Sequence, residues 1–223
     1  MIMDASVRPP DPLQAERERM VAEQVAARGV RDPRVLAALR EVPRHLFVPR
    51  ELRAEAYQDH PLDIGHGQTI SQPYVVAVMT ELARVRPTST VLEIGTGCGY
   101  QTALLAHLAR EVYSIEYIEA LATQAARVLV ELGYHNVQVR AGDGSGGWPG
   151  KAPFDAIVIT AAPRRVPAAL LEQLKLGGRL VAPEGGVTQV LRVYTRTETG
   201  FVVEDVLAVR FVPMVGGAER TGG

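Results

Sequence analysis

The first third of the chain has the apolar and polar spacing of helices. Residues 13–28 gather apolar side chains on one face and charged side chains on the other, which predicts a helix capped by Gly29. Asp32 followed by Pro33 is typical of a helix start, and this second helix is expected to end near residue 42. The next stretch is less regular.

Residues 51–60 favour a weaker third helix, and residues 61–72 have the composition of a loop. Pro73 then opens a helix that is expected to continue to about residue 84. The chain up to this point therefore predicts a mainly helical segment interrupted by one long loop.

From residue 90 the pattern changes to short apolar runs that alternate with helical patterns. Strands are expected at residues 90–94, 111–115, 137–141, 155–160 and 179–183, and helices at residues 99–109, 118–132 and 167–174. This alternation is typical of a parallel sheet with helices on both faces. Residues 189–196 and 202–211 are two further strands separated by a short turn, which predicts an antiparallel hairpin.

Composition narrows the class of protein only slightly. The 223 residues are 47% hydrophobic and 22% charged, with a formal net charge of −1, so neither a nucleic acid nor a membrane is indicated as a partner. The single cysteine, Cys98, excludes an internal disulfide and a multi-cysteine zinc site, and it is compatible with a reducing cytoplasm. The five histidines are scattered without metal-ligand spacing, so we expect no metal.

A glycine-rich loop is the strongest chemical signal. E-I-G-T-G-C-G at residues 93–99 lies between the first strand of the sheet and a helix, an arrangement that lets backbone approach a nucleotide-bearing ligand. The dinucleotide motif fails in both registers, because Tyr100 and Thr102 stand where its third small residue belongs. Glu93 would repel a pyrophosphate but not a ligand with an amine or sulfonium cation.

Two more carboxylates follow the next two strands. Glu116 is placed to accept hydrogen bonds from ribose hydroxyls, and Asp143 is placed to bind an adenine amine. Taken singly, Glu116 is as well explained as a helix-start acid and Asp143 as a turn residue. Their placement after successive strands, at the usual ligand edge of such a sheet, favours an adenosyl ligand.

At these residues the chain resembles the S-adenosylmethionine-dependent methyltransferases of the seven-stranded class. Five further segments make the resemblance to the protein-L-isoaspartate O-methyltransferases close. They are V-P-R-H-L-F-V-P (42–49), H-G-Q-T-I-S-Q-P (66–73), F-D-A-I-V-I-T-A-A-P (154–163), L-G-G-R-L-V-A-P (176–183) and V-R-F-V-P-M (209–214). The similarity covers about residues 13–216, and the T-I-S and R-F-V-P-M segments are its most specific parts.

The resemblance implies an α/β fold with a Rossmann-like, doubly wound seven-stranded sheet, a C-terminal antiparallel hairpin and an N-terminal helical extension. Residues 1–12 are expected to be a flexible arm and residues 13–223 a single methyltransferase domain. Within it, residues 13–85 would form the substrate-side extension and residues 86–223 the cofactor-binding core. Cys98 stands where serine is common in the family, and we expect it to be a small packing residue.

The implied activity is protein repair. The methyl group of S-adenosylmethionine would pass to the free α-carboxylate of L-isoaspartyl residues in damaged proteins, leaving S-adenosylhomocysteine. The cofactor would be bound by Gln68, Thr69, Ile70, Glu93, Gly95, Thr96, Gly97, Gly99, Glu116, Gly142, Asp143 and Gly144. The substrate would be bound by Ile70, Ser71, Val212 and Pro213, with Ser71 as the catalytic residue.

Elementary chemistry limits what Ser71 has to do. A carboxylate nucleophile is already ionised at neutral pH and the sulfonium activates the methyl group, so an in-line displacement needs no general base. We expect Ser71 to hold the carboxylate oxygen that does not attack. The alternative is that its hydroxyl caps the helix that Pro73 opens. Ile70 is equally explained as a wall of the methyl site or as a core anchor, and residues 210–214 as a strand that pairs with the substrate or as an ordinary closing strand.

Two other functions are weighed. One is methylation of a small molecule or nucleic acid on the same fold, which the absence of a basic stripe and of a base-amine motif disfavours. The other is a cofactor-binding adaptor without catalysis, which the intact loop at residues 68–71 disfavours. We expect a cytoplasmic monomer that acts on isoaspartyl proteins and peptides and binds neither nucleic acid nor membrane.

Overall fold

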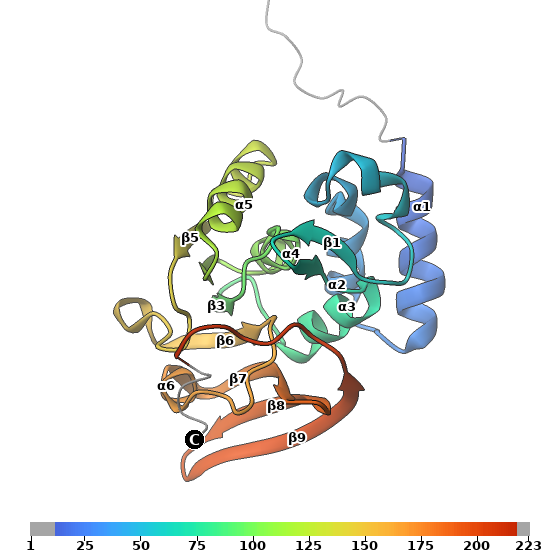
Figure 1. The fold of residues 1–223 in the computed structure, drawn as a ribbon. Coiled ribbons are helices and arrows are strands. Elements are labelled where there is room, and N and C mark those ends of the chain that lie inside the picture. Colours follow the sequence, from blue (N-terminus) through green and yellow to red (C-terminus); the bar gives the residue numbers. More distant parts are fainter. Residues whose placement is uncertain (1–11, 218–223) are drawn as a thin grey trace, which may run out of the picture.

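The computed structural model describes residues 12–217 and is built around a seven-stranded sheet (Figure 1). The strands are β3 (Thr90–Ile94), β4 (Glu111–Glu116), β5 (Val137–Ala141), β6 (Phe154–Ile159), β7 (Leu174–Gly185), β8 (Gln189–Thr197) and β9 (Gly200–Val209). Their spatial order is β5-β4-β3-β6-β7-β8-β9; the pairs from β5 to β7 are parallel, and β8 and β9 add an antiparallel hairpin. The predicted fold class is confirmed.

Six α-helices surround the sheet in the described part of the chain. They are α1 (Gln14–Arg19), α2 (Pro33–Glu41), α3 (Pro73–Leu82), α4 (Tyr100–Leu108), α5 (Glu119–Glu131) and α6 (Ala168–Glu172). The predicted caps are confirmed at both ends of the first connection: Gly29 adopts φ 100°, and the Asp32 side chain accepts a hydrogen bond from the Arg34 amide. None of these helices is long and apolar enough to cross a membrane.

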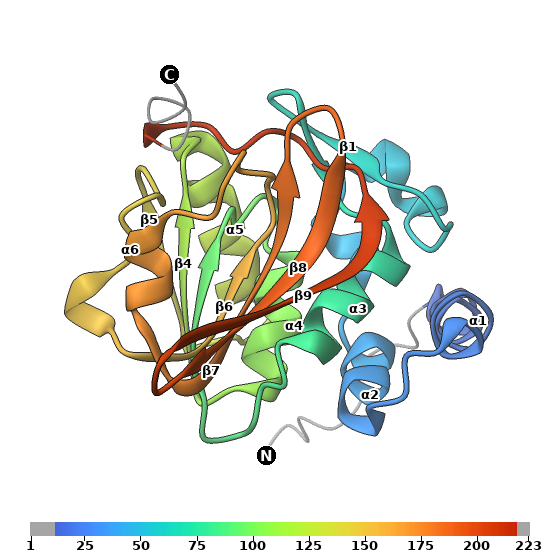
Figure 2. The same cartoon turned by 90° about the horizontal axis from the view of Figure 1, so that it is seen from below.

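Central strands are apolar without alternation because both sheet faces are covered. Every residue of β3 is buried, and its side chains point alternately into two apolar clusters. Val91 belongs to the cluster that also contains the α3 and α4 side chains and the N-terminal extension, whereas Leu92 and Ile94 belong to the cluster beneath α6. The helical extension thus packs on one face of the sheet (Figure 2).

The prediction of one helix over residues 13–28 is wrong in its interior. Only α1 is α-helical, and it is followed by a π-helical segment at Met20–Val25 and a 3-10 turn at Ala26–Arg28. In a π-helix each backbone amide donates to the carbonyl five residues earlier. Met20 and Val25 are therefore neighbours on the helix surface, and both are fully buried. Burial of these side chains overrides the regular helical register.

Residues 51–60 and 61–72 also differ from the predictions. The third helix is only a 3-10 segment, Arg50–Glu55, and the expected loop contains an antiparallel hairpin, β1 (Leu62–Gly65) with β2 (Gln68–Ile70). His66 and Gly67 at its turn both have positive φ, as a type I′ turn requires. The residues of β1 are alternately buried and exposed, and the apolar residues Leu62 and Ile64 were the available sequence signal for this strand.

The predicted helix at residues 167–174 is too long at its C-terminal end. It is a single short helix, α6, and Leu174 already belongs to β7, where it pairs with Phe154. Tertiary pairing with β6 therefore extends β7 at the expense of the helix. β7 is correspondingly longer than the predicted strand 179–183.

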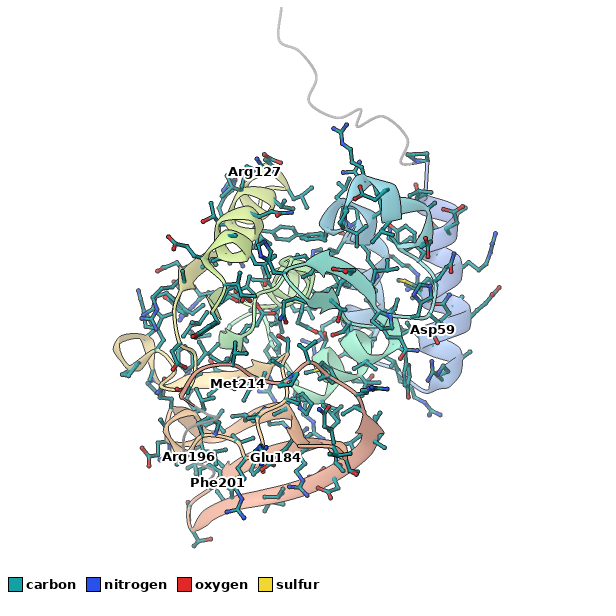
Figure 3. All side chains as sticks on the ribbon, viewed as in Figure 1. Asp59, Arg127, Glu184, Arg196, Phe201 and Met214 are labelled. Atoms are coloured by element: carbon teal, nitrogen blue, oxygen red, sulfur yellow. The ribbon has the colours of Figure 1, made fainter. Side chains whose placement is uncertain are left out.

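The segment after β9 crosses the whole sheet. Figure 2 shows it running from the end of β9, over the carboxyl ends of the parallel strands, toward the far edge near β5. We call residues 211–217 the C-terminal strap. Met214 anchors it, since this side chain is 4% exposed and belongs to the cluster beneath α6 (Figure 3).

Candidate active site

The glycine loop lies between β3 and α4 and is shaped by left-handed backbone. Gly95, Gly97 and Gly99 have φ values of 96°, 55° and 92°. At Gly95 a Cβ would collide with the Thr160 hydroxyl, which donates to the Gly95 carbonyl. The loop therefore presents bare backbone to the space above the sheet.

Glu116 closes one side of this space. Its carboxylate accepts hydrogen bonds from the Gly97 amide at 2.8 Å and from the Ile118 amide at 2.9 Å. These bonds fix the carboxylate beside the glycine loop at the end of β4, where it is 6% exposed. It is thus positioned in advance for a hydroxyl-bearing ligand.

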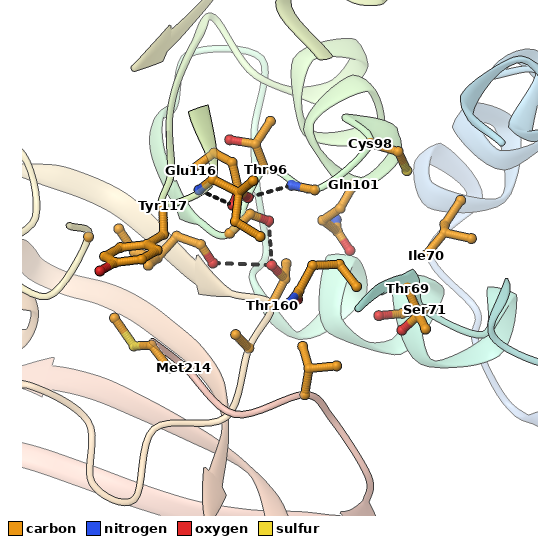
Figure 4. A pocket seen from close by; sticks show the side chains of 18 of the residues that line it. Thr69, Ile70, Ser71, Thr96, Cys98, Gln101, Glu116, Tyr117, Thr160 and Met214 are labelled. Carbon is orange, nitrogen blue, oxygen red and sulfur yellow. Dashed lines mark hydrogen bonds between the residues drawn. The ribbon is translucent and has the colours of Figure 1, made fainter. Parts of the chain in front are cut away.

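A cavity extends from Glu116 across the loop to the β1–β2 hairpin. Figure 4 places Glu116 and Ser71 on opposite sides of it, with Thr160 between them. Eleven of the predicted site residues line this cavity: Gln68, Thr69, Ile70, Ser71, Gly95, Thr96, Gly97, Glu116, Gly144, Val212 and Pro213. Two segments that lie far apart in the sequence, the hairpin and the strap, are therefore brought to one site.

Four predicted cofactor residues do not line the cavity: Glu93, Gly99, Gly142 and Asp143. Gly99 begins α4, and a Cβ there would touch Ala125 and Leu129 of α5. Gly142 donates its amide to the Glu116 carbonyl, and thereby supports the strand end that carries this carboxylate. Gly99 and Gly142 therefore shape the site from outside.

Glu93 lies beneath the glycine loop and is completely buried. One carboxylate oxygen accepts from Thr102 Oγ1 at 2.5 Å and from Ser114 Oγ at 2.6 Å, and the other has no partner among the described residues. Burial raises the pKa of Glu93 to about 8, against the lowering effect of the two hydroxyls. The Ser114 hydroxyl is also hydrogen-bonded to Thr96 Oγ1 at 2.5 Å. Ser114 and Thr96 therefore link Glu93 to the cavity, which Glu93 itself does not line.

Asp143 is turned toward the strap. Its carboxylate accepts from the Ser145 amide at 2.9 Å and from the Gly217 amide at 2.7 Å. The neighbouring Gly144 does line the cavity, and a Cβ at this position would lie 2.5 Å from Ile94 Cγ2. The turn after β5 thus supplies both a contact surface for a ligand and an anchor for the strap.

A second opening lies on the far side of Ser71. It is bounded by the start of α3, by Pro61 and Arg28 of the extension, and by the end of β9 with the first residues of the strap. Thr69, Ser71, Thr160 and Val212 line both this groove and the first cavity. The two spaces therefore meet at Ser71.

The sequence prediction missed several lining residues. The most informative are Thr160, Tyr117 and Met214, which lie in the cavity wall together with the predicted set. Thr160 and Tyr117 directly follow β6 and Glu116, so their place at the carboxyl ends of parallel strands was the available signal. No local pattern marks Met214, because its position depends on the course of the strap.

The charge of the lining restricts the ligand. Among the described lining residues, Glu116 is the only carboxylic acid, and Cys98, Tyr100 and Tyr117 are the only other ionisable side chains. A site with one carboxylate and no lysine, arginine or histidine in its described wall fits a cationic ligand and disfavours a phosphate.

Cys98 and His45 both have structural surroundings. Cys98 is buried, and burial raises the pKa of its thiol to about 11, so it packs as a neutral side chain. His45 contacts the Tyr57 hydroxyl at 2.7 Å, away from the cavity. Among the described residues, no group of histidine, cysteine or acidic side chains is arranged to hold a metal ion.

The sheet order and the glycine-loop cavity define a Rossmann-like methyltransferase fold. A solved protein-L-isoaspartate O-methyltransferase matches with a TM-score of 0.81 and 30% identity over 91% of this chain, which spans 66% of that protein. A second structure, a putative protein-L-isoaspartate O-methyltransferase from Plasmodium falciparum in complex with S-adenosyl-L-homocysteine, has a TM-score of 0.77 and 23% identity. The match with the Plasmodium protein covers 89% of this chain and 98% of that protein.

Sequence comparison identifies the family. The profile of the protein-L-isoaspartate(D-aspartate) O-methyltransferases matches residues 15–219. Curated members from Synechococcus sp. (strain JA-2-3B'a(2-13)) and Picosynechococcus sp. are 55% and 56% identical, and each match covers more than 90% of both proteins. This chain belongs to the protein-L-isoaspartate O-methyltransferase family.

Proposed function

We propose that this protein transfers the methyl group of S-adenosylmethionine to the free α-carboxylate of L-isoaspartyl residues, and so acts in the repair of damaged proteins. The observation that carries this proposal is the junction at Ser71, where the cavity with the anionic wall meets the open groove. A small cationic donor on one side and a peptide carboxylate on the other would meet there. Membership of the family supports the same activity.

The cavity residues fit the methyl donor. Glu116 is fixed by two amides where it can accept from ribose hydroxyls, and Gly144 lines the cavity at a position where a Cβ would collide with Ile94. We assign Gly95, Thr96 and Gly97 to the middle of the cofactor, and residues 68–70 to its methionine end. S-Adenosylmethionine supplies a methyl group activated by the sulfonium charge.

The groove fits a peptide in an extended conformation. Residues 207–212 run along it at the end of β9, which is an edge strand of the sheet. Backbone pairing at this edge would suit substrates of many sequences, with Val212 and Pro213 beside the reacting residue. Arg210 is exposed on the groove and would attract a substrate that carries a carboxylate.

Ser71 is assigned the positioning of the carboxylate. Its hydroxyl makes no hydrogen bond to a described residue, and Gln72 rather than Ser71 stands at the N-cap of α3, where no side chain caps the helix. The hydroxyl is therefore available to hold the oxygen that does not attack, which leaves the other oxygen free to face the methyl group. No base is required, because the α-carboxyl group is ionised at neutral pH.

The decisive experiment compares paired peptides that differ only in an L-isoaspartyl or a normal aspartyl residue. With labelled S-adenosylmethionine, we expect labelling of the isoaspartyl peptide alone. Equal labelling of both peptides, or binding of the cofactor without transfer to either, would defeat the proposal; the second result would favour a cofactor-binding adaptor.

Removal of the Ser71 hydroxyl tests the assigned role. We expect Ser71→Ala to lower kcat/KM for the isoaspartyl peptide by about 10–1000-fold, by analogy with the loss of one preorganised donor, which costs about 100–1000-fold. Thr199→Ala removes an exposed hydroxyl in the β8–β9 turn and serves as the matched control. An unchanged kcat/KM in Ser71→Ala would show that the hydroxyl takes no part in catalysis.

We further propose that the enzyme acts in the cytoplasm as a monomer, on proteins and peptides rather than nucleic acids. The net charge of −1 and the single, buried cysteine support this setting. Light scattering of the purified protein would test the monomer.

A further inference from the structure

The C-terminal strap is held at three places as it crosses the sheet. At its start, the Gln189 side chain clamps the Phe211 backbone: its amide nitrogen donates to the Phe211 carbonyl at 3.1 Å, and its oxygen accepts from the Phe211 amide at 2.7 Å. In the middle, Ala162 donates to the Val212 carbonyl and accepts from the Met214 amide, both at 2.8 Å. Met214 is then buried below.

The last part of the strap is anchored to the turn after β5 by one backbone hydrogen bond among the described residues. Residues 215–217, which we call the strap tip, are tied down through the Gly217 amide, which donates to Asp143 Oδ2 at 2.7 Å. Val215 in this tip is 39% exposed and lines the cofactor cavity, as do Gly144 and Tyr117. The tip therefore covers the end of the cavity that lies beside the turn after β5.

The strap tip lies so close to Asp143 that a side chain on either glycine would displace this carboxylate or strain the backbone. A Cβ on Gly216 would lie 2.8 Å from Asp143 Oδ1, and Gly216 has a φ of 109°, which side chains rarely adopt. A Cβ on Gly217 would lie 3.0 Å from Ser145 Oγ and 3.1 Å from Asp143 Oδ2. Two glycines in succession thus allow backbone to press against this carboxylate.

We propose that Asp143 is a positioning residue that latches the strap tip over the cofactor cavity and so sets the rate at which cofactor and product exchange. The inference rests on the proposed cofactor site, since the tip covers the end assigned to the adenosyl group. The clamps at Gln189 and Ala162 hold the first part of the strap, whereas the tip opens when its bond to Asp143 breaks. Asp143 therefore acts through the strap, not only on the ligand.

The same geometry separates exchange from chemistry. Val212, which lines both the cofactor cavity and the peptide groove, lies in the part of the strap that Ala162 and Gln189 secure. Opening of the tip leaves this part in place. Substrate binding should thus be insensitive to the latch, while release of S-adenosylhomocysteine should depend on it.

The test measures release of S-adenosylhomocysteine from the full chain without peptide. We expect Gly216→Ala and Gly217→Ala to speed release about tenfold, equivalent to about 1.4 kcal/mol, and to raise the KM for S-adenosylmethionine. The KM for the isoaspartyl peptide and the preference for isoaspartyl over aspartyl peptides should stay unchanged. Gly186→Ala is the control, because Gly186 is exposed with nothing within 4 Å of its added Cβ.

Asp143→Asn provides a second approach, since it weakens the acceptor without crowding the tip, and it should also speed release. If one glycine variant fails to fold, the other decides the question. Release within twofold of wild type in folded glycine variants would overturn the latch, even if Asp143→Asn weakens binding, because direct ligand contact would then explain Asp143. A wild-type protein that binds no cofactor would overturn both proposals. Normal binding with no isoaspartyl transfer would overturn only the proposed function.

Discussion

The buried carboxyl group of Glu93 gives the most direct test of the electrostatics of this fold. One of its oxygens accepts from Thr102 and Ser114. The other has no partner in the described part of the chain and is the natural place for a proton. In Glu93→Gln the amide oxygen can accept the same two hydrogen bonds, while the amide nitrogen takes the place of the protonated oxygen. The substitution therefore imitates the neutral form of the residue at every pH.

The direction of the effect follows from the raised pKa. The carboxyl group titrates at about 8 in the folded protein, against 4.5 for its ordinary value, so the folded protein keeps a proton that the unfolded chain releases. Stability should therefore be highest below pH 4.5, fall as the pH rises towards 8, and level off above it. Each pKa unit is worth about 1.4 kcal/mol, which makes the whole effect on the order of 5 kcal/mol.

Urea unfolding without cofactor between pH 4.5 and pH 9 checks this expectation. We expect Glu93→Gln to match wild type near pH 4.5 and to become more stable by about 3–5 kcal/mol near pH 8, since the variant has no charge to desolvate. The control is Glu198→Gln, at an exposed position in the β8–β9 turn. Its difference in stability from wild type should not change with pH. A variant that is less stable than wild type by the same amount at every pH would refute the reasoning.

Three other predictions follow from local geometry and chemistry. Asp32→Ala should cost about 1 kcal/mol in urea unfolding, because the bond from the Arg34 amide to the N-cap side chain is lost. Gly95→Ala should weaken cofactor binding at least ~10-fold in calorimetry, since its Cβ meets Thr160 at a φ of 96°. At saturating cofactor, kcat/KM for the isoaspartyl peptide should stay constant from about pH 6 to 7.5, because the nucleophile titrates near 3.5; a limb near pH 7 would indicate a general base.

Local patterns determined most of the sheet, because its strands and helices have clear periods. The parallel strands are short and buried on both faces, so apolar runs such as β3 and β6 stand out against the helices between them. The errors arose where tertiary contacts decide the backbone. Met20 and Val25 gain burial from a π-helical segment, and β1 forms because β2 pairs with it.

The site was predictable as far as ligand contacts follow strand ends. Glu116 and Gly144 lie in the cavity wall as expected, since successive strands of a parallel sheet bring their carboxyl ends to one edge. Glu93 also follows this rule in sequence, but its side chain points toward α4, where Thr102 receives it. Side chains alternate between the two faces of β3, and this alternation directs Glu93 toward α4 instead of the cavity. The sequence motif alone does not reveal which face of the sheet an acidic residue occupies.

The two acids also explain how one site combines charge selection with an interior suited to methyl transfer. The reaction joins an anion and a cation, so its transition state carries less separated charge than the reactants and is favoured by a poorly hydrated environment. An ionised Glu93 would draw water towards the centre of the sheet, but its raised pKa keeps it neutral at pH 7. Glu116 then remains as the one carboxylate at the described cavity wall, held by two amides away from Ser71. Attraction for a cationic ligand is thereby located at one end of the cavity, and the junction where the methyl group would be transferred is left without a competing anion.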